Sequence, residues 1–197
     1  IIMSNSINIS KYFKDVSKII SGLGKEQKNI NKIATSLINC QRKGNKLLVA
    51  GNGGSCADAE HFVGELVCTF IKRDKKPISA INLNSDTASI TAWSNDFNYE
   101  TFCERMVDAH GKKNDILFLI STGGGNYENK ASLNLVHAAL LAKKRGLKII
   151  SLVGKSGGEL KKISDLVIVI KNNSTSIIQE AHMSILHSIC YLLEKKL

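Results

Sequence analysis

The stretch KLLVAGNGGSCADAEHFVGE, at residues 46–65, decides the fold class of this chain. Residues 46–50 form an apolar run of strand length, and the glycine-rich turn GNGGS follows at residues 51–55. A helical pattern then runs from Cys56 to about residue 70. A strand, a tight glycine turn and a helix in this order are typical of one unit of a parallel sheet. The stretch therefore predicts an α/β fold.

The rest of the 197-residue chain repeats this alternation of strands and helices. A parallel sheet with helices on both faces accounts for the pattern, because parallel strands need long crossover connections. The length fits one domain with a full-sized core, so we expect a single domain over residues 1–197. Four more strands complete a five-stranded parallel sheet. They are expected at residues 78–83, 115–120, 148–153 and 166–170, with helical segments at residues 86–109, up to about residue 145, and at 177–193.

The first part of the chain, residues 8–43, also carries apolar residues at helical spacing. We expect one or two helices there, broken near the glycines at residues 22–24. These helices form an N-terminal extension to an α/β core at residues 46–197. Ile1 and Ile2 precede Met3 and are set aside from the fold.

The composition is that of an ordinary soluble protein, with 43% hydrophobic and 22% charged residues. No apolar run approaches the roughly 18–20 residues that span a bilayer. The opening residues lack the basic and apolar regions of a signal peptide. The five cysteines are scattered and include no C-x-x-C pair, which disfavours both disulfides and a cysteine zinc site. These features predict a cytoplasmic protein with no membrane partner.

The formal net charge of +10 indicates an anionic partner. The lysines lie in short clusters, at residues 72–76, 112–113, 143–145 and 161–162, and the sequence has no basic helix with interleaved aromatic residues. A basic surface that attracts phosphorylated metabolites accounts for this pattern better than nucleic-acid binding does. Binding to DNA would instead require an affinity that falls steeply with salt.

Two glycine-rich turns follow strands and precede helices, at residues 51–55 and at residues 121–126, where the sequence reads STGGGN. Glycines let the backbone approach an anion, and a helix start offers unpaired N–H groups. Hydroxyls and free amides make a neutral cradle for a phosphate monoester. Each turn alone is equally consistent with an ordinary tight connection or helix cap. No lysine follows the glycines, which disfavours a nucleotide-binding loop.

Acid–base and metal candidates fall on two predicted helices. His61 and Glu65 stand four residues apart and share one helix face. Near the end of the chain, Gln179 and His187 lie on the last helix, together with Glu180 and His182. A set of His, Glu, Gln and His could bind zinc, and Glu65 and His187 could equally transfer protons. From spacing alone, surface or satisfied core roles remain open for each of them.

Several segments together resemble one enzyme family. They are AGNGGSCADAEHFVGE at residues 50–65, SNDF at 94–97, IST at 120–122, VGKSGG at 153–158 and QEAHMSILH at 179–187. This combination is similar to the phosphoheptose isomerases, a branch of the sugar isomerase (SIS) proteins. The resemblance extends over nearly the whole chain, including the N-terminal helices. It implies flavodoxin-like subunits that form a homotetramer with active sites where subunits meet.

The resemblance also implies a reaction and a set of site residues. The reaction converts sedoheptulose 7-phosphate to D-glycero-D-manno-heptose 7-phosphate through an enediol, for lipopolysaccharide or capsule. Glu65 is the expected base at carbon and His187 the partner acid/base. One Zn²⁺ is expected, with His61, Glu65, Gln179 and His187 as its ligands. The expected substrate-binding residues are Asn52, Gly53, Gly54, Ser55, Glu65, Asn95, Asp96, Ser121, Thr122, Gly123, Asn126 and Gln179.

The chain departs from the family pattern at five positions. Family members usually read STSGNS at the phosphate turn, whereas this chain has Gly123, Gly125 and Asn126 in place of the second serine, the asparagine and the last serine. Thr69 stands where an arginine is usual, and Ser176 where an aspartate is usual. These departures leave open an isomerase of a related phosphosugar. A non-catalytic SIS protein that binds a phosphosugar or a partner protein is the other alternative.

Overall fold

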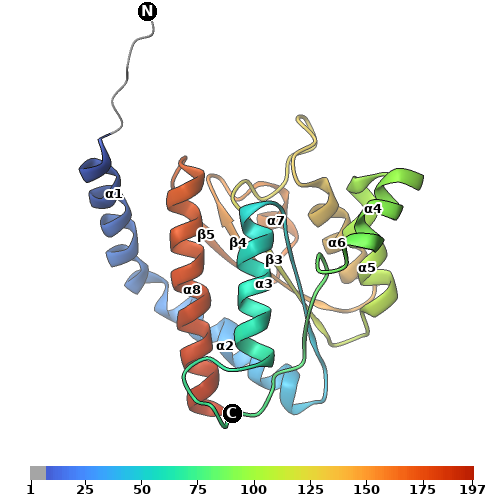
Figure 1. Cartoon of the computed structure of the whole chain (residues 1–197), viewed down its shortest axis with the longest axis horizontal. Helices are drawn as coiled ribbons and strands as arrows, with labels where there is room; N and C mark the ends of the chain where they lie inside the picture. The colour runs from blue at the N-terminus through green and yellow to red at the C-terminus, as the bar shows by residue number, and fades with distance from the viewer. Residues whose placement is uncertain (1–7) are drawn as a thin grey trace, which may run out of the picture.

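The structure is a computed structural model that describes residues 8–197; residues 1–7, with Ile1 and Ile2 among them, lie outside the described part. Helices and strands alternate along the chain, and the helices surround one central sheet that the strands form (Figure 1). The elements are α1 (Ile9–Gly22), η1 (Leu23–Glu26), α2 (Gln27–Arg42), β1 (Leu47–Gly51), α3 (Gly54–Val67), β2 (Ala80–Asn82), α4 (Thr87–Asp96), η2 (Tyr99–Thr101), α5 (Phe102–His110), β3 (Ile116–Ser121), α6 (Leu133–Lys144), β4 (Lys148–Gly154), α7 (Gly158–Ile163), β5 (Leu166–Ile170) and α8 (Thr175–Lys196).

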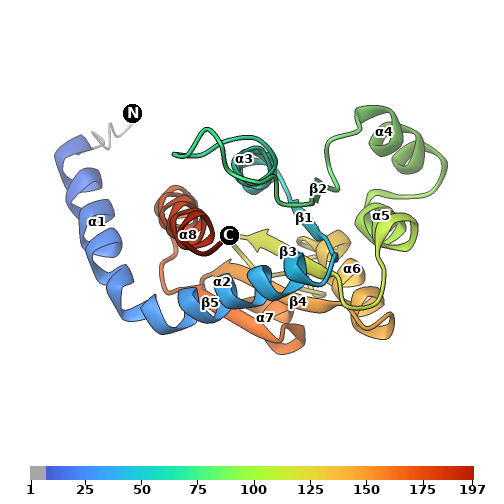
Figure 2. The same cartoon turned by 90° about the horizontal axis from the view of Figure 1, so that it is seen from below.

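All five strands are parallel and lie in the order β2-β1-β3-β4-β5, which confirms the predicted flavodoxin-like sheet. Side chains of β1 alternate between the two faces, as a strand buried on both sides requires. Leu47 and Val49 pack in a cluster with α2, α3 and α8, whereas Leu48 and Ala50 pack in a second cluster with α5, α6 and α7. Figure 2 shows these two layers of helices on opposite faces of the sheet.

The predicted second strand, residues 78–83, is longer than the observed β2 (Ala80–Asn82). The amide of Ile78 donates to the carbonyl of Leu66 at the end of α3, so this residue closes the connection instead of pairing with β1. The predicted helix over residues 56–70 was also misplaced at its ends, because α3 begins two residues earlier, at Gly54, and ends at Val67. The break predicted near residues 22–24 is confirmed by the 3₁₀ turn η1.

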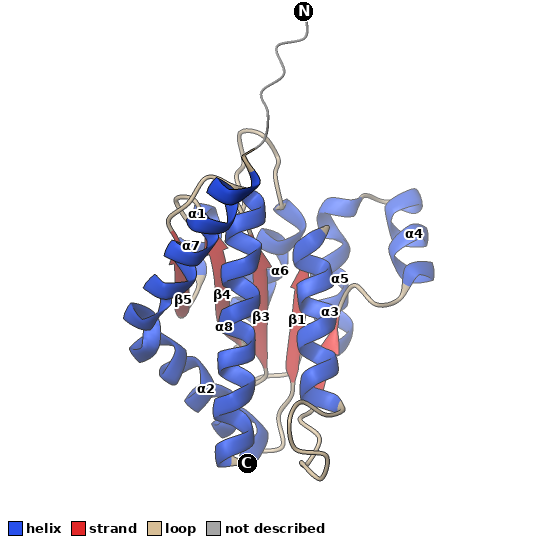
Figure 3. Ribbon diagram, turned by 60° about the vertical axis from the view of Figure 1, so that its left-hand side comes forward, coloured by secondary structure: helices blue, strands red, loops and turns tan. Residues whose placement is uncertain are grey.

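Two helices touch the core only with partly buried side chains, α1 with Ile19 and Ile20 and α4 with Ile90 and Trp93. No residue of α1 is buried, and the side chains of Ile9 and Phe13 are 59% and 63% exposed. No residue of α4 is buried either, and α4 lies at the edge of the molecule beyond β2 (Figures 1 and 3). No helix within residues 8–197 is long and apolar enough to cross a membrane.

Candidate active site

The two glycine-rich turns meet at one place because β1 and β3 are neighbours in the sheet. The strand order reverses between β1 and β3, and in open α/β sheets this switch point forms a crevice at the carboxyl ends of the strands. The turn after β1 leads into α3, and β3 ends at Ser121, the first residue of the second turn. The topology therefore places both predicted phosphate turns at one edge of the sheet.

Gly54 begins α3 and lies against a side chain from the far end of the sequence. A Cβ atom at Gly54 would lie 2.1 Å from Nε2 of Gln179 on α8, closer than any real contact allows. The preceding residue, Gly53, has a φ of 53°, in the left-handed region that glycine tolerates. Glycine at both positions therefore serves the local backbone and leaves room for Gln179 over the turn.

His61, Glu65 and His187 converge between α3 and α8. The Nε2 atom of His61 lies 3.3 Å from Oε1 of Glu65, one helical turn along α3. The same Nε2 atom lies 3.3 Å from Nε2 of His187, which projects from α8. The side chain of His61 is 46% exposed and that of Glu65 is 23% exposed, so solvent and small ligands can reach the group.

Aromatic side chains form one wall of this cluster. The ring of Phe70 stacks on His187 with a centroid distance of 5.8 Å and an interplanar angle of 19°. Tyr191, one turn further along α8, meets Phe70 edge-on at 4.9 Å. Contact on one ring face restricts how the imidazole of His187 can turn, and it holds the nitrogen toward His61.

The second turn does not follow the arrangement that its sequence predicts. Ser121 accepts a hydrogen bond from the amide of Gly124 at 3.0 Å, as an anion-binding turn requires of its first hydroxyl. Asn126, however, is exposed and pairs with Ala131 in an isolated antiparallel bridge, so the residues between them form a loop that leaves the sheet (Figure 1). The hydroxyl of Ser132 lies 3.5 Å from that of Ser121.

The sequence of this chain is similar to those of known proteins. A family profile described as "SIS domain" matches residues 11–154. The chain is 40% identical over 168 residues to a phosphoheptose isomerase of Geobacter sp. (strain M21), covering 85% of this chain and 84% of the relative. It is 38% identical over 190 residues to a probable phosphoheptose isomerase of Thermoplasma acidophilum, covering 96% of this chain and 100% of the relative. The chain belongs to the phosphoheptose isomerase family.

Solved structures agree with this assignment. A phosphoheptose isomerase from Francisella tularensis superimposes with a TM-score of 0.88 at 30% identity, covering 95% of this chain and 97% of that one. The corresponding enzyme from Neisseria gonorrhoeae gives a TM-score of 0.86 at 27% identity, covering 95% and 97% of the two chains. Membership of the phosphoheptose isomerase family makes this chain an isomerase of the SIS fold.

Ser132 is a candidate site residue that the linear pattern of the phosphoheptose isomerase family did not reveal. Asn126, which the sequence places at the last position of the phosphate turn, begins a loop that closes through its antiparallel bridge to Ala131. Ser132 then stands at the N-terminus of α6, in the left-handed region with a φ of 53°. The sequence signal for Ser132 was its place between the loop at residues 126–131 and the helical pattern that follows.

Asn52, in the first turn, connects the two turns through its side chain. Its amide pairs reciprocally with that of the buried Asn134, with N···O distances of 2.9 and 2.8 Å. It also donates to Ser132 and accepts a hydrogen bond of 2.7 Å from the hydroxyl of Tyr99. These bonds use both donors and both lone pairs of the amide. The geometry therefore gives the Asn52 side chain a bracing role, and sequence spacing indicated neither Asn134 nor Tyr99.

Asp58 lies one turn before His61 on α3 and was not a candidate from the sequence. Its Oδ2 atom is buried without a hydrogen-bond partner among the described residues. Burial raises the pKa of Asp58 to about 6, with a further increase from the negative charge of Glu180 and a decrease from His61. Asp58 is therefore a buried carboxyl group close to the histidine cluster, and its surroundings raise its pKa.

The remaining predicted residues fall in two places, at the two turns and at the end of α4. Ser55 is buried in the first turn of α3, whereas Thr122 and Gly123 are partly exposed after β3. Asn95 and Asp96 form a hydrogen bond of 2.9 Å with each other at the end of α4 and are exposed. The recorded hydrogen bonds within residues 8–197 do not connect this pair to the other candidates. The structure thus brings the two turns together with α3 and α8, whereas Asn95 and Asp96 on α4 are not hydrogen-bonded to the other candidates.

The donor set of His61, Glu65, Gln179 and His187 fits zinc in its chemistry. Two ligand atoms on one tetrahedral zinc, each at about 2.0–2.1 Å, lie roughly 3.3 Å apart, which matches both contacts of His61. Within residues 8–197, however, no group of three His, Cys, Asp and Glu side chains is arranged so that it could hold a metal ion. The contacts of His61 with Glu65 and His187 are thus the part of the expected ligand set that the structure brings together.

Proposed function

We propose that this chain interconverts sedoheptulose 7-phosphate and D-glycero-D-manno-heptose 7-phosphate. The observation that carries the proposal is the convergence of His61 and Glu65 of α3 with His187 of α8, from helices far apart in the sequence. A protein that only binds a phosphosugar needs no paired acid and base next to the sugar. The family relationship supports the same reaction class, because the relatives are named phosphoheptose isomerases.

The isomerisation moves one proton between adjacent carbons. In the proposed mechanism the carboxylate of Glu65 removes a proton from C1 of the ketose, which gives a cis-enediol, and then delivers a proton to C2; in deuterated water, exchange of the proton held by Glu65 would bring deuterium to C2. The imidazole of His187 gives a proton to O2 and removes the proton from O1, so the number of protons is conserved. The exposed fractions of His61 and Glu65 are consistent with access for the sugar from the solvent side.

Phosphate binding would occupy the two turns at the switch point. In this proposal the hydroxyls of Ser121 and Ser132, whose oxygens lie 3.5 Å apart at the switch point, would bind the anion. Binding at this end supplies energy that positions the other end of the sugar against Glu65 and His187. The neutral cradle suits a phosphate monoester of a sugar better than a nucleotide, because no loop lysine is present in the turns.

His61, Glu65, Gln179 and His187 are the residues that would hold one Zn²⁺. When bound, the ion would polarise the sugar oxygens and stabilise the negative charge of the enediolate. The roles in zinc binding and proton transfer share Glu65 and His187, since a carboxylate has two oxygens and an imidazole two nitrogens. Gln179 would reach the site across Gly54, which carries no side chain to obstruct it.

We also propose that the enzyme is a cytoplasmic homotetramer whose sites are completed at subunit interfaces. The apolar stripe of α1, with Ile9 and Phe13 exposed, and the exposed end of α4 are surfaces that a second copy would cover. Asn95 and Asp96 lie on α4 and would then contact substrate held by another subunit. The free thiols of the five cysteines are consistent with a reducing compartment.

The test is incubation of the zinc-loaded protein with sedoheptulose 7-phosphate in deuterated water, followed by NMR. A heptose 7-phosphate product with deuterium at C2, lost in Glu65→Gln and His187→Gln, would support the proposal. Binding of the ketose without turnover would instead point to a related phosphosugar, in line with the altered turn at residues 123–126. Neither binding nor turnover would favour a non-catalytic SIS protein that binds another partner.

A further inference from the structure

A cavity of about 680 Å³ lies at the end of the sheet opposite the proposed active site. It is lined by residues of α2, including Lys28, Lys32 and Ser36, and by the first residues of two strands, Lys148 of β4 and Leu166 of β5. These are the amino ends of the strands, whereas the glycine turns stand at the carboxyl ends. We refer to it as the amino-end cavity. Its volume lies within the range of small-molecule sites.

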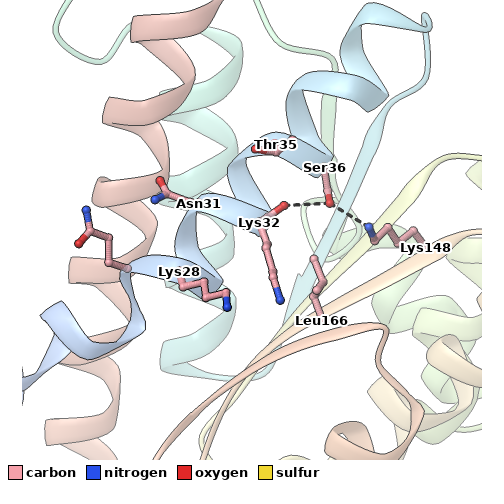
Figure 4. Close-up of a pocket in the computed structure, with 8 residues that line it drawn as sticks. Lys28, Asn31, Lys32, Thr35, Ser36, Lys148 and Leu166 are labelled. Carbon is pink, nitrogen blue, oxygen red and sulfur yellow. Dashed lines mark hydrogen bonds between the residues drawn. The ribbon is translucent and has the colours of Figure 1, made fainter.

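Three lysines give the amino-end cavity a strong positive charge. Lys28 and Lys32 stand four residues apart on α2 and therefore share one helix face. Figure 4 shows both ammonium groups turned toward the same part of the cavity, next to Leu166. Lys148 approaches from β4 on the other side of that leucine. Three ammonium groups on one lining favour an anionic ligand.

No carboxylate within residues 8–197 forms an ion pair with any of these three lysines. The two acids next to lining residues in the sequence are already engaged elsewhere. Glu26 accepts a hydrogen bond of 2.7 Å from the side chain of Asn29, and Asp165 accepts one of 2.7 Å from the amide of Ile149. These hydrogen bonds leave both carboxylates charged, but neither carboxylate pairs with Lys28, Lys32 or Lys148 within the described residues, so the three ammonium groups remain open to an anion.

Lys148 is held in a fixed position. Its ammonium group donates to the hydroxyl of Ser36 at 2.9 Å, and that hydroxyl donates in turn to the carbonyl of Lys32 at 3.0 Å (Figure 4). The hydroxyl hydrogen of Ser36 is thereby used in a hydrogen bond, and the hydroxyl oxygen orients the ammonium group of Lys148. An ammonium group has three N–H donors, so Lys148 retains two for an anion. The cavity thus offers one ordered and two adaptable cations.

We propose that the amino-end cavity binds a nucleoside diphosphate. A diphosphate monoester carries about three negative charges at neutral pH, which equals the charge of the three lysines. Leu166 and the aliphatic stems of Lys28 and Lys32 offer apolar surface for a base or ribose. The side-chain amide of Asn31 can recognise the polar edge of a base. This site is separate from the proposed isomerase site and does not depend on it.

The test is titration of the full chain with ADP and with inorganic pyrophosphate by isothermal calorimetry. We expect saturable ADP binding that weakens by about tenfold or more in the Lys28→Ala/Lys32→Ala variant and with added salt. The matched control is Lys14→Ala/Lys18→Ala, an exposed lysine pair at the same spacing on α1. This control should bind ADP as the wild type does. The single charge reversal Lys32→Glu gives a second test of the same surface.

Two further measurements show whether ADP binds at the amino-end cavity or at the proposed phosphate turn. Ser121→Ala, in the proposed phosphate turn, should leave ADP affinity unchanged, and Lys28→Ala/Lys32→Ala should leave isomerase turnover unchanged. Equal ADP affinity in the wild type and the Lys28/Lys32 variant would overturn the proposal, as would the absence of saturable heat. Pyrophosphate binding as tight as that of ADP would overturn the nucleoside part. Weaker pyrophosphate binding, lost in the same variant, would support the whole proposal.

Discussion

The Nε2 atoms of His61 and His187 lie 3.3 Å apart although 126 positions separate these residues in the sequence. His61 is on α3 and His187 on α8, two helices that pack side by side on one face of the sheet (Figures 1 and 3). Without a metal, one imidazole must donate to the other, since two unprotonated nitrogens would repel. With a zinc ion between them, both could be unprotonated at Nε2 and act as ligands.

Zinc binding should depend on both histidines. We expect His61→Ala and His187→Ala each to weaken binding by at least about a hundredfold, because each removes a direct ligand. Substitution with cobalt(II) gives the readout, since tetrahedral cobalt absorbs strongly in the visible range. His110→Ala, at the exposed end of α5, is the control and should retain the wild-type spectrum. A wild-type spectrum in His61→Ala would show that the metal binds elsewhere.

Gly54→Ala should reduce turnover without unfolding the chain. The new Cβ atom would meet Nε2 of Gln179 at 2.1 Å, and that obstructing atom is the far end of a flexible side chain. Gln179 would therefore be displaced at little cost in stability, and we expect kcat to fall about tenfold or more. Gly64→Ala is the matched control in the same helix, because its Cβ meets nothing within 4 Å.

Gly64→Ala should raise the free energy of unfolding by about 0.5–1 kcal/mol, from helix propensity alone, and leave activity intact. Thermal melting and steady-state kinetics on both glycine variants separate the two effects. Retained activity in Gly54→Ala would show that Gln179 is dispensable at the site.

Ser132→Ala should raise KM for the sugar phosphate, whereas Asn126→Ala should not. Ser132 places its hydroxyl 3.5 Å from that of Ser121, and a hydrogen bond to a charged phosphate contributes about 1.5–3 kcal/mol, or roughly ten- to a hundredfold in affinity. Asn126 is exposed in the loop at residues 126–131 and serves its own turn. Inhibition by inorganic phosphate should weaken in parallel with the KM. The reverse pattern of effects would show that Asn126, and not Ser132, binds the phosphate.

His182 should make the chain less stable as the pH falls from about 6.5 to 4. It is fully buried on α8, and neither ring nitrogen has a hydrogen-bond partner within the described residues, although the nearby Val153 backbone favours the charged form. Burial lowers the pKa of His182 to about 4. The unfolded chain therefore binds a proton in this window that the folded chain does not bind.

At pH 4 this difference amounts to about 3 kcal/mol of lost stability, and above pH 6.5 it vanishes. Urea unfolding of the wild type and of His182→Leu between pH 4 and 7 measures it. We expect the variant to lose less stability across this range, since it cannot take up the proton on unfolding. Parallel pH profiles for the two proteins would contradict the prediction.

Asp58 should make the chain less stable as the pH rises, which is opposite to the effect of His182. Because burial raises the pKa of this carboxyl to about 6, the folded state holds its proton more tightly than the unfolded state, and stability is lost as the pH rises through the interval from 3.8 to 6. Asp58→Asn should remove that loss, so its stability relative to the wild type should increase over the same interval. A difference that stays constant with pH would show that the carboxyl group is solvated in solution.

Much of the fold follows from local patterns. The apolar run at residues 46–50, followed by GNGGS, predicted β1 and the turn into α3, and the same alternation located every other strand to within a few residues. The start of β2 was placed two residues too early because the amide of Ile78 bonds to Leu66 of the preceding helix. A tertiary hydrogen bond of this kind has no local signal in the sequence.

The candidate site could be predicted from the sequence only in part. The i, i+4 spacing of His61 and Glu65 placed both on one helix face, which the contact of 3.3 Å between them confirms. The positions of Ser132, Asn134 and Tyr99 around Asn52 could not be inferred. Ser132 and Asn134 depend on where the loop at residues 126–131 returns to the sheet, and Tyr99 depends on how η2 packs in the connection between β2 and β3; loop length leaves both undetermined.

The sequence alone thus determined the order of strands and helices, the two turns and the types of side chain available for chemistry. These properties depend on hydrophobic periods of 2 and 3.6 residues and on the backbone freedom of glycine, which act within a few residues. Only the tertiary structure decided that His61 meets His187, that Asn52 is braced by Asn134, and that Lys148 approaches Ser36 at the far end of the sheet. Such contacts join residues 82 to 126 positions apart and arise from the packing of helices on a shared sheet.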